Sequence, residues 1–337
     1  MFDRASRKEN TMWAQSLIGP GQFELQDVPD LTEDDLTAGG VLVEFLAGGI
    51  CGSDLPRVRG AFDPHKEAYG TRGWPFHEVV GRVIASRDGR HKPGSRVLGW
   101  ALGFGGLAER FVGDGEYLLE LDDQLSDVDG AVVQALAAVV SFYDLISEVA
   151  GKRVAVIGQG PYGILLGALA AVHGAEEVVG IDPVPRAEEA ARVGINVSLR
   201  EGSRVWARSL RDSDRPDIVI EAVGHQQSTL ADAIEAVRPG GEVYFFGAPG
   251  DTHYTIPFAL AFQKALLLRG ASSLNHRRSL ASAQALALEH PEIAETLATH
   301  VFNYRDAEEA FLRALTPKAH QLKIALTADG ATERRTS

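Results

Sequence analysis

The residues best suited to chemistry lie in two short segments of the first third of the chain. The segment Gly49–Asp54 holds Cys51, the only cysteine among 337 residues, and the pair His77-Glu78 follows further along. A lone cysteine can form neither an internal disulfide nor a multi-cysteine zinc site. It therefore packs in the core, acts as a nucleophile, or serves as one ligand of a mixed metal site. The neighbouring Asp54 and the His-Glu pair favour the third alternative.

A second group of residues has the spacing of a nucleotide-binding turn. The segment Gly158–Gly163 follows the apolar run Val154–Ile157 and opens an amphipathic stretch. In this context its first glycine permits a tight turn, the second lets a pyrophosphate approach the backbone, and the third allows the helix to pack on the strand. The helix N-terminus supplies free N–H groups, and a proline fits its first turn. The residues predicted to bind a dinucleotide here are Gly158, Gly160, Pro161, Tyr162 and Gly163.

The choice of dinucleotide depends on the acid that ends the next predicted strand. Asp182 would accept hydrogen bonds from both ribose hydroxyls of the adenosine, and its charge would repel a 2′-phosphate, which favours NAD over NADP. Arg186 nearby leaves NADP open, and Asp182 alone could be a capping residue before Pro183. Weaker candidates for cofactor contacts follow later strands at their carboxyl ends: Val223, Gly224 and Gly247.

Composition and charge narrow the class of protein. Lys and Arg number 33 against 46 Asp and Glu, and the resulting net charge of −13 argues against binding to nucleic acid. The apolar stretches reach about half the length needed to span a bilayer. The polar N-terminus lacks the apolar core of a signal peptide. We therefore expect a cytoplasmic protein with no membrane or nucleic-acid partner, and polar tails at 1–10 and 328–337.

Two kinds of pattern divide the chain. From Val41 to about Leu121, short apolar runs broken by glycine predict a β-rich unit, and 130–148 has helical spacing. From about 150 to 273, unbroken apolar runs alternate with helical segments, which predicts an α/β fold with a doubly wound parallel sheet. The region 274–337 has two helical patterns and a final strand, Leu322–Leu326. The strands expected in the parallel sheet are 154–157, 178–181, 217–220, 242–246 and 266–268.

These motifs give the chain a resemblance to the medium-chain dehydrogenase/reductases, specifically the zinc-dependent alcohol and polyol dehydrogenases. The resemblance covers essentially the whole chain, from GGICGSD through FHEVVGRV, GGLAERFV and the glycine-rich turn to the closing KIAL strand. It implies a GroES-like β-rich catalytic domain, formed by 1–147 together with 274–337, and a Rossmann NAD-binding domain at 148–273. It also implies a homodimer or homotetramer, with Glu242–Phe246 as the candidate edge strand.

The resemblance also implies roles for the first group of residues. Cys51, His77 and Glu78 would bind one catalytic zinc and leave its fourth position open for water or alcohol. Asp54 would orient the zinc-bound histidine, and Ser53 would pass the substrate proton onward. The four-cysteine lobe that holds a structural zinc in many relatives is absent, because the chain has a single cysteine.

Three positions depart from the family pattern. Phe76 replaces the glycine before the histidine, which would put a bulky ring beside the metal. Gln134 stands where many polyol dehydrogenases carry a glutamate, and its amide could contact substrate or a metal-bound water. Pro56 replaces the histidine that often ends the proton relay, so protons must leave by another route.

The resulting hypothesis is the NAD-linked, zinc-dependent oxidation of a secondary alcohol to a ketone, or the reverse, on a polar substrate such as a sugar, polyol, cyclitol or aminocyclitol. Simpler roles remain open for two ligands, since His77 could be a core histidine and Glu78 could pair with Arg82 or Arg72. One rival is a zinc-free NAD(P)H-dependent reductase of the same superfamily. Another is a catalytically inactive, nucleotide-binding regulatory protein.

Overall fold

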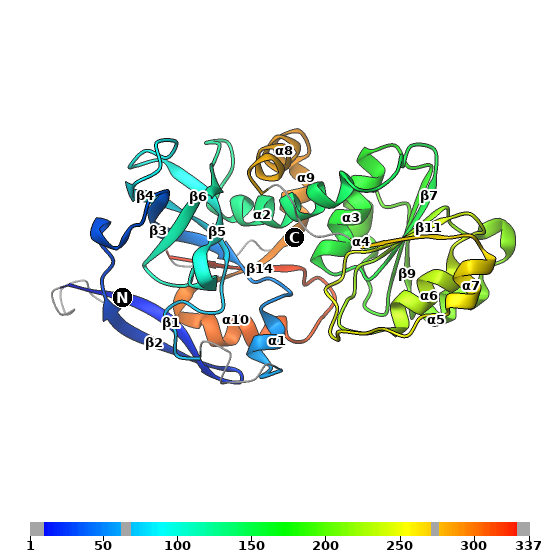
Figure 1. Cartoon of the computed structure of the whole chain (residues 1–337), viewed down its shortest axis with the longest axis horizontal. Coiled ribbons are helices and arrows are strands. Elements are labelled where there is room, and N and C mark those ends of the chain that lie inside the picture. The colour runs from blue at the N-terminus through cyan, green and yellow to red at the C-terminus, as the bar shows by residue number, and fades with distance from the viewer. Residues whose placement is uncertain (1–9, 62–68, 271–275, 329–337) are drawn as a thin grey trace.

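The computed structural model describes residues 10–61, 69–270 and 276–328. The polar tails expected at the two ends, and the predicted domain boundary at 273/274, therefore lie outside the described residues, apart from residues 10 and 328. Within these ranges two six-stranded sheets lie at opposite ends of the molecule, with helices between them (Figure 1).

The first sheet is mixed and has the strand order β13-β14-β3-β4-β5-β6, with β3 also pairing with β6. A hairpin, β1 and β2, lies beside it at the N-terminal end. The predicted runs LAERFVG and EYLLEL belong to one long strand, β6. The bounds are β1 Thr11–Gly19, β2 Gln22–Pro29, β3 Gly40–Gly49, β4 Glu78–Ser86, β5 Arg96–Ala101, β6 Arg110–Glu120, β13 Ala298–Asn303 and β14 Lys323–Thr327.

The second sheet is parallel throughout, with the order β12-β11-β10-β7-β8-β9. This is the doubly wound order expected for a Rossmann fold, in which the first strand lies at the centre and the chain winds outward in both directions. The bounds are β7 Arg153–Ile157, β8 Glu177–Asp182, β9 Val197–Arg200, β10 Ile218–Glu221, β11 Glu242–Phe245 and β12 Leu267–Gly270.

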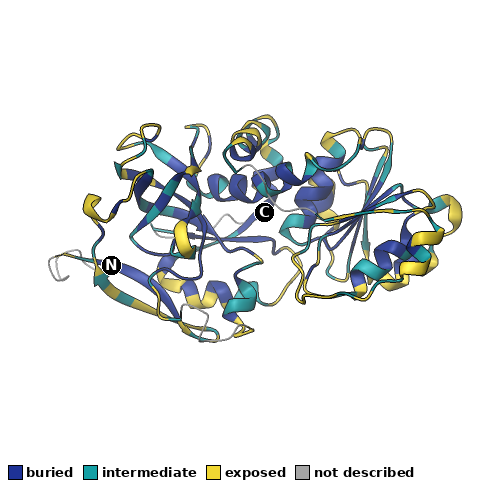
Figure 2. Ribbon diagram, in the orientation of Figure 1, coloured by how far each residue is buried: buried dark blue, intermediate teal, exposed yellow. Residues whose placement is uncertain are grey.

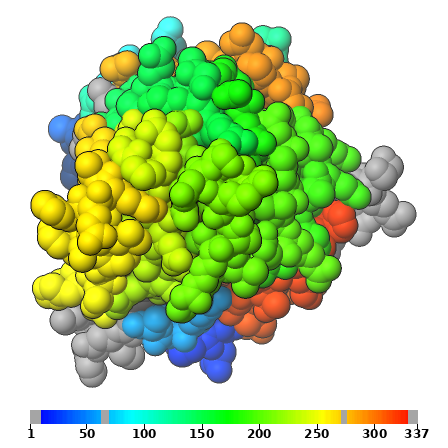
Figure 3. Space-filling view, turned by 90° about the vertical axis from the view of Figure 1, so that its right-hand side faces the viewer, coloured from blue at the N-terminus to red at the C-terminus, as the bar shows by residue number. Residues whose placement is uncertain are grey.

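Alternating residues of the central strand β7 pack on opposite faces of this sheet. Val154 and Val156 belong to the core shared with α3, whereas Ala155 and Ile157 belong to the core shared with α5 and α6. Burial on both faces explains why the strand is an unbroken apolar run. The helices are α3 Pro161–Val172, α4 Ala187–Arg192, α5 Ser203–Ser209, α6 Ser228–Ala236 and α7 Phe258–Gln263. Figure 3 looks onto this half of the molecule.

The edge strand of the parallel sheet differs from the one expected. The segment 242–246 was the candidate edge, but β11 lies between β10 and β12 and is hydrogen-bonded on both sides. The edge is instead β12, which follows it in the chain. The short strand β9 at the other edge was not expected, because its partly exposed sequence lacks an apolar run.

The longest helix in the described part of the chain, α2 (Asp127–Tyr143), joins the two halves. Its N-cap Ser126 accepts a hydrogen bond from the backbone of Asp129, and most of the helix is buried. It packs against β3 and β4 on one side and against α3 on the other. Figure 2 shows the buried α2 and α3 between the two sheets. The helix ends at Tyr143, earlier than the 130–148 spacing suggested.

The C-terminal region completes the first sheet. It contains α8 His276–Glu289, α9 Pro291–Leu297 and α10 Ala307–Ala314, where the sequence predicted two helices, and β13 in addition to the expected final strand. That final strand, β14, lies between β13 and β3. The α/β class with a GroES-like sheet and a Rossmann sheet is confirmed. No helix in the described ranges is long and apolar enough to cross a membrane.

Candidate metal and dinucleotide site

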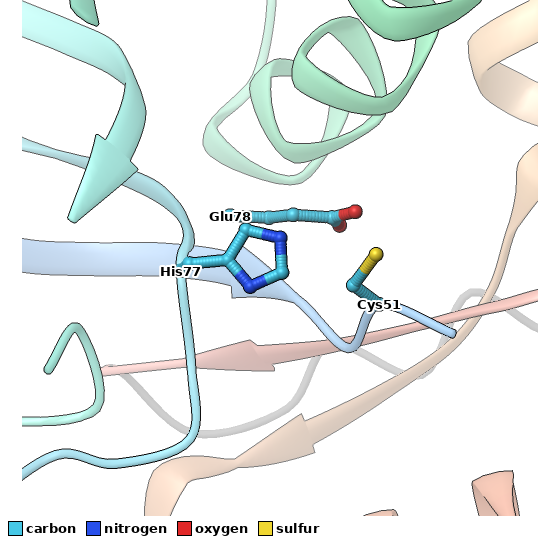
Figure 4. A group of neighbouring side chains, drawn as sticks. All are labelled: Cys51, His77 and Glu78. Carbon is cyan, nitrogen blue, oxygen red and sulfur yellow. The ribbon is translucent and has the colours of Figure 1, made fainter. Parts of the chain in front are cut away.

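The three predicted metal ligands meet at the carboxyl end of β3. Cys51 follows this strand, His77 directly precedes β4, and Glu78 is the first residue of β4. Their ligand atoms all lie within 4.8 Å of one another, and all three side chains are buried. The side chains converge from two neighbouring segments of the same sheet (Figure 4). A thiol, an imidazole and a carboxylate thus share one small volume.

Two glycines of β3 make room for this arrangement. A Cβ at Gly49 would collide with Oε2 of Glu78, and one at Gly48 would collide with the ring of Phe76. The sequence reasoning that put a bulky ring beside the metal was therefore wrong about Phe76. Its ring is fully buried in the core beneath the sheet, with its centroid 6.1 Å from that of Phe45.

The aromatic ring that does lie beside the candidate ligand comes from Phe104. Its centroid is 4.6 Å from that of the His77 ring, in an edge-on contact, and the guanidinium carbon of Arg57 lies 4.6 Å from the same phenyl ring. Phe104 belongs to the short 3-10 turn Leu102–Phe104, which directly follows β5.

Asp54 holds both His77 and the backbone of Cys51 in place. Its Oδ1 lies 3.0 Å from Nδ1 of His77, and its Oδ2 accepts a hydrogen bond of 3.0 Å from the backbone N–H of Cys51. Burial alone would lower the pKa of His77, but the Asp54 carboxylate and Cys51 outweigh it and raise that pKa well above its usual value. With Nδ1–H donated to Asp54, the lone pair of Nε2 is the one that a metal would use.

The partner of Glu78 is a buried lysine that sequence reasoning missed as a site residue. Nζ of Lys323 lies 2.5 Å from Oε2 of Glu78, and both side chains are almost completely buried. Burial would lower the pKa of Lys323, but Glu78 and Cys51 raise it above its usual value, so the lysine stays charged. The arginine partner considered earlier, Arg82, instead donates to the carbonyl of Gly94.

The sequence did contain a signal for this ion pair. Lys323 opens the apolar run of the final strand, and a lysine is almost never fully buried unless it is paired. A lysine in a strand of that kind therefore indicates a buried carboxylate nearby, although the sequence does not say which one.

Tyr162 is also in the site, in a role that the sequence did not predict. Its hydroxyl lies 3.4 Å from Sγ of Cys51 and donates a hydrogen bond of 3.3 Å to Oε1 of Glu78. Removal of the hydroxyl from water, with Cys51 and Glu78 nearby, raises the pKa of Tyr162 well above its usual value. The phenol therefore keeps its proton. The residue was predicted to bind the dinucleotide, and its side chain points to the candidate metal ligands.

The other predicted residues lie on neighbouring elements. Gln134 is buried on α2, and its Oε1 has no hydrogen-bond partner among the described residues. Ser53 lies in the turn between Cys51 and Asp54, where the N–H of Asp54 bonds the carbonyl of Cys51. Pro56 is part of the short helix α1 (Leu55–Val58).

The cluster fits a divalent metal in both donor chemistry and charge. Metal binding requires a deprotonated cysteine and a neutral histidine. In that state Cys51, Asp54 and Glu78 would carry negative charge against Lys323 alone, whereas in the metal-free cluster the raised pKa of His77 makes it a second buried positive charge. Such an excess of buried negative charge is costly, and a divalent cation between the ligands would neutralise it. The amide oxygen of Gln134 has no hydrogen-bond partner among the described residues, and a bound water or ligand would supply one.

The glycine-rich turn has the geometry that its spacing predicts. Gly158 has a positive φ of 92°, and a Cβ at Gly163 would collide with the carbonyl oxygen of Gly158. By contrast, a Cβ at Gly160 would have nothing within 4 Å. Pro161 is the first residue of α3. The turn is therefore tight, and its third glycine packs against the first. The space above the second glycine, Gly160, is open, so its backbone is accessible to a pyrophosphate.

The two residues expected to select the dinucleotide lie at the end of β8 and just before α4. Asp182 accepts hydrogen bonds from the backbone N–H groups of Gln159 and Val184, both at 2.7 Å. Arg186 is buried and donates to the carbonyl of Lys318 at 2.8 Å, and its Nε has no partner among the described residues. Burial lowers the pKa of Arg186.

A buried acid that the sequence analysis did not single out organises the later loop. Oε1 of Glu221, the last residue of β10, accepts hydrogen bonds from the N–H groups of Val223 and Gly224 and from the hydroxyl of Thr229. Gly247 lies against Gly224, where no side chain would fit. The Glu221 carboxylate therefore binds Val223 and Gly224, and Gly247 packs against Gly224, at the carboxyl end of the parallel sheet.

The two halves of the chain match two family models. Residues 37–123 match the alcohol dehydrogenase GroES-like domain, and residues 161–289 match the zinc-binding dehydrogenase domain. An alcohol or polyol oxidoreductase with a GroES-like sheet and a Rossmann sheet is the class that these matches and the fold define. The chain belongs to the medium-chain dehydrogenase/reductase superfamily.

Similar proteins span nearly the whole chain. D-xylulose reductase A from Aspergillus oryzae is 27% identical over 341 residues, which covers 90% of this chain and 93% of the relative. An alcohol dehydrogenase from Thermus sp. ATN1 is 26% identical, with a TM-score of 0.79 and coverage of 94% and 100%. A zinc-binding dehydrogenase from Sinorhizobium meliloti 1021, solved with NADP, is 21% identical with a TM-score of 0.79 and coverage of 95% and 100%.

The buried ion pair yields a first prediction. Lys323→Met should lower the free energy of unfolding of the metal-free protein by about 3–5 kcal/mol, because it leaves the buried charge of Glu78 without a partner. Lys152→Met is the matched control. It breaks a partly exposed pair with Glu242 and should cost about 1 kcal/mol or less. Urea unfolding measures both losses.

A companion variant separates the pair from simple packing. Adding Glu78→Gln to Lys323→Met removes the unpaired charge and should recover a large part of the lost stability. Equal losses for the two lysine variants, or no recovery in the double variant, would contradict the interpretation.

Proposed function

We propose that this protein is a zinc-dependent, NAD-linked dehydrogenase that interconverts a secondary alcohol and a ketone on a polar substrate. The observation that carries the proposal is the buried convergence of Cys51, His77 and Glu78 within 4.8 Å. A thiolate, an imidazole and a carboxylate form a ligand set that zinc accepts, with a fourth position open to substrate.

The side chains of the site have distinct roles in this proposal. Zinc bound by the three ligands would polarise the substrate oxygen and lower the pKa of an alcohol toward neutrality. Asp54 fixes the tautomer and the orientation of His77. Ser53, in the same turn, takes the proton from the substrate hydroxyl. Hydride transfer belongs to the nicotinamide, which the glycine-rich turn and α3 would hold through its pyrophosphate.

The proposed substrate class is a sugar, polyol, cyclitol or aminocyclitol. Support comes from the similarity to D-xylulose reductase A over most of the chain. Gln134 also offers a buried amide oxygen without a partner among the described residues, and the hydroxyls of a polyol could donate to it. A plain alkanol would leave this amide unsatisfied, which is costly in a buried site.

A zinc-free reductase is the second candidate, and one observation favours it. Lys323 already neutralises Glu78 through Oε2, and Tyr162 donates to Oε1, so the carboxylate is satisfied without a metal. The remaining buried groups support the zinc-dependent candidate. The thiol of Cys51 has only weak contacts, with the Tyr162 hydroxyl at 3.4 Å and with His77, whereas zinc would use both the sulfur and the Nε2 of His77.

Metal content tests the main proposal directly. Protein purified without chelator should contain about one zinc per chain, and less than about half an equivalent would contradict the proposal. Cys51→Ala should lose both metal and alcohol oxidation while it retains dinucleotide binding. His91→Gln is the control, because His91 is a buried histidine whose Nε2 lies 3.0 Å from the carbonyl oxygen of Gly115, outside the cluster, and it should keep the metal.

The preference for NAD rests on the charge of Asp182 at the end of β8. Arg186 is held by a carbonyl and lies near Asp182 and Glu189, so its charge is offset rather than free for a 2′-phosphate. Of the solved structures that share this fold, one holds NADP and another holds NADH, so the fold accepts either dinucleotide.

Asp182→Asn should therefore change cofactor preference. Removing the charge should raise the affinity for NADPH relative to NADH by about tenfold, or about 1.4 kcal/mol. Asp217→Asn is the control, since Asp217 lies at the opposite end of the sheet, where it bonds the backbone of Arg153. Fluorescence titration with both reduced dinucleotides measures the ratio. An unchanged ratio in the Asp182 variant would remove this basis for NAD.

A homodimer or homotetramer is part of the same proposal, as is a cytoplasmic location, which the acidic composition and the single cysteine favour. The edge strand β12 carries Leu267, which is 47% exposed, and Phe258 and Phe262 on the adjacent α7 are 71% and 79% exposed. A second copy of β12 would satisfy its unpaired backbone groups. Sedimentation velocity should give a dimer or tetramer, and a Phe258→Asp, Phe262→Asp variant should dissociate it. A monomeric wild-type protein would contradict this arrangement.

A further inference from the structure

Tyr162 connects the two halves of the proposed active site. It is the second residue of α3, in the same turn that presents free N–H groups above Gly160. Its hydroxyl nevertheless reaches the other half, 3.4 Å from Sγ of Cys51 and 3.3 Å from Oε1 of Glu78. One residue of the dinucleotide-binding turn thus contacts two of the three candidate metal ligands.

The ring of Tyr162 is in contact with two further side chains. The ring of Phe246, the residue after β11, lies with its centroid 5.1 Å away, and Nζ of Lys323 lies 5.7 Å from the centroid of the tyrosine ring. The same lysine is bound to Glu78. Tyr162, Lys323 and Glu78 therefore form a closed set of contacts, and a shift of the first turn of α3 must alter at least one of them.

We propose that Tyr162 is a positioning residue that couples dinucleotide binding to the metal site. A pyrophosphate bound at the turn fixes the position of Tyr162. The tyrosine hydroxyl then fixes the orientation of the Glu78 carboxylate and its own contact with the sulfur of Cys51. Because coupling between two binding sites is reciprocal, metal bound at the ligands must change dinucleotide affinity by the same factor. This inference rests on the proposed function, because it requires a metal at the site.

The test uses cobalt, whose charge-transfer band with a thiolate ligand reports on the environment of Cys51. The dinucleotide probe is ADP-ribose, which carries the adenosine and pyrophosphate but no nicotinamide to enter the metal site. Tyr162→Phe removes only the hydroxyl and keeps the ring. Tyr143→Phe is the matched control, since Tyr143 also bonds α3, through the carbonyl of Leu166, but does not contact a ligand.

The expected results concern spectra and affinities rather than activity. In the wild-type protein, saturation with ADP-ribose should shift the cobalt–thiolate band, and cobalt should change the Kd of ADP-ribose by about fivefold or more. Tyr162→Phe should alter the band without any dinucleotide, lose most of the ADP-ribose response, and bring the ratio of the two Kd values close to one. Tyr143→Phe should behave like the wild type.

Each contrary outcome is distinct. A wild-type Kd for ADP-ribose that is the same with and without cobalt overturns the coupling, and this measurement needs no variant to fold. Cobalt binding with an identical spectrum and response in Tyr162→Phe overturns the role of the hydroxyl while the metal site stands. Failure of all three proteins to bind cobalt overturns the metal site itself, and this inference with it.

Discussion

The arrangement of the site depends on the buried ion pair between Lys323 and Glu78. Two full charges out of water are stable only when they are paired closely and hydrogen-bonded well. Here Nζ lies 2.5 Å from one carboxylate oxygen, and the other oxygen accepts from Tyr162. The lysine comes from β14, which lies beside β3 in the first sheet. The C-terminal segment is therefore required for the site as well as for the sheet, because without it Glu78 would be buried unpaired.

Space for that pair is created by the absence of side chains. Gly48 and Gly49 occupy successive positions of β3, whose side chains would point to opposite faces of the sheet. On one face the missing Cβ admits the ring of Phe76 into the core, and on the other it admits Glu78 and Lys323. The packing of Phe76 in the core and the assembly of the polar cluster therefore both depend on this Gly-Gly dipeptide.

The sequence predicted the fold and the main clusters for clear physical reasons. Unbroken apolar runs and the glycine spacing depend on local geometry, so β7, the turn and α3 could be located before the structure was known. The side chains of Phe76, Tyr162 and Lys323 could not be placed in the same way, because their orientation depends on contacts between distant segments. Adjacency to His77 in the chain suggested a ring beside the ligand, whereas that ring comes from Phe104 on another turn.

The edge of the parallel sheet shows the same limit. The run at 242–246 and the one at 266–268 are both short and apolar, and nothing in either indicates which strand has a neighbour on both sides. Strand order is set by the whole topology rather than by any strand's composition.

The interface between the two halves of the chain restricts their relative movement. Domain interfaces within a chain commonly allow relative motion. In this protein the largely buried helix α2 packs on both halves, and the polar contacts of Tyr162 link the glycine-rich turn to the candidate ligand cluster across the same region. A movement of one half against the other would strain the contacts of Tyr162 with Cys51 and Glu78, so we expect the relative position of the two halves to affect the candidate metal ligands.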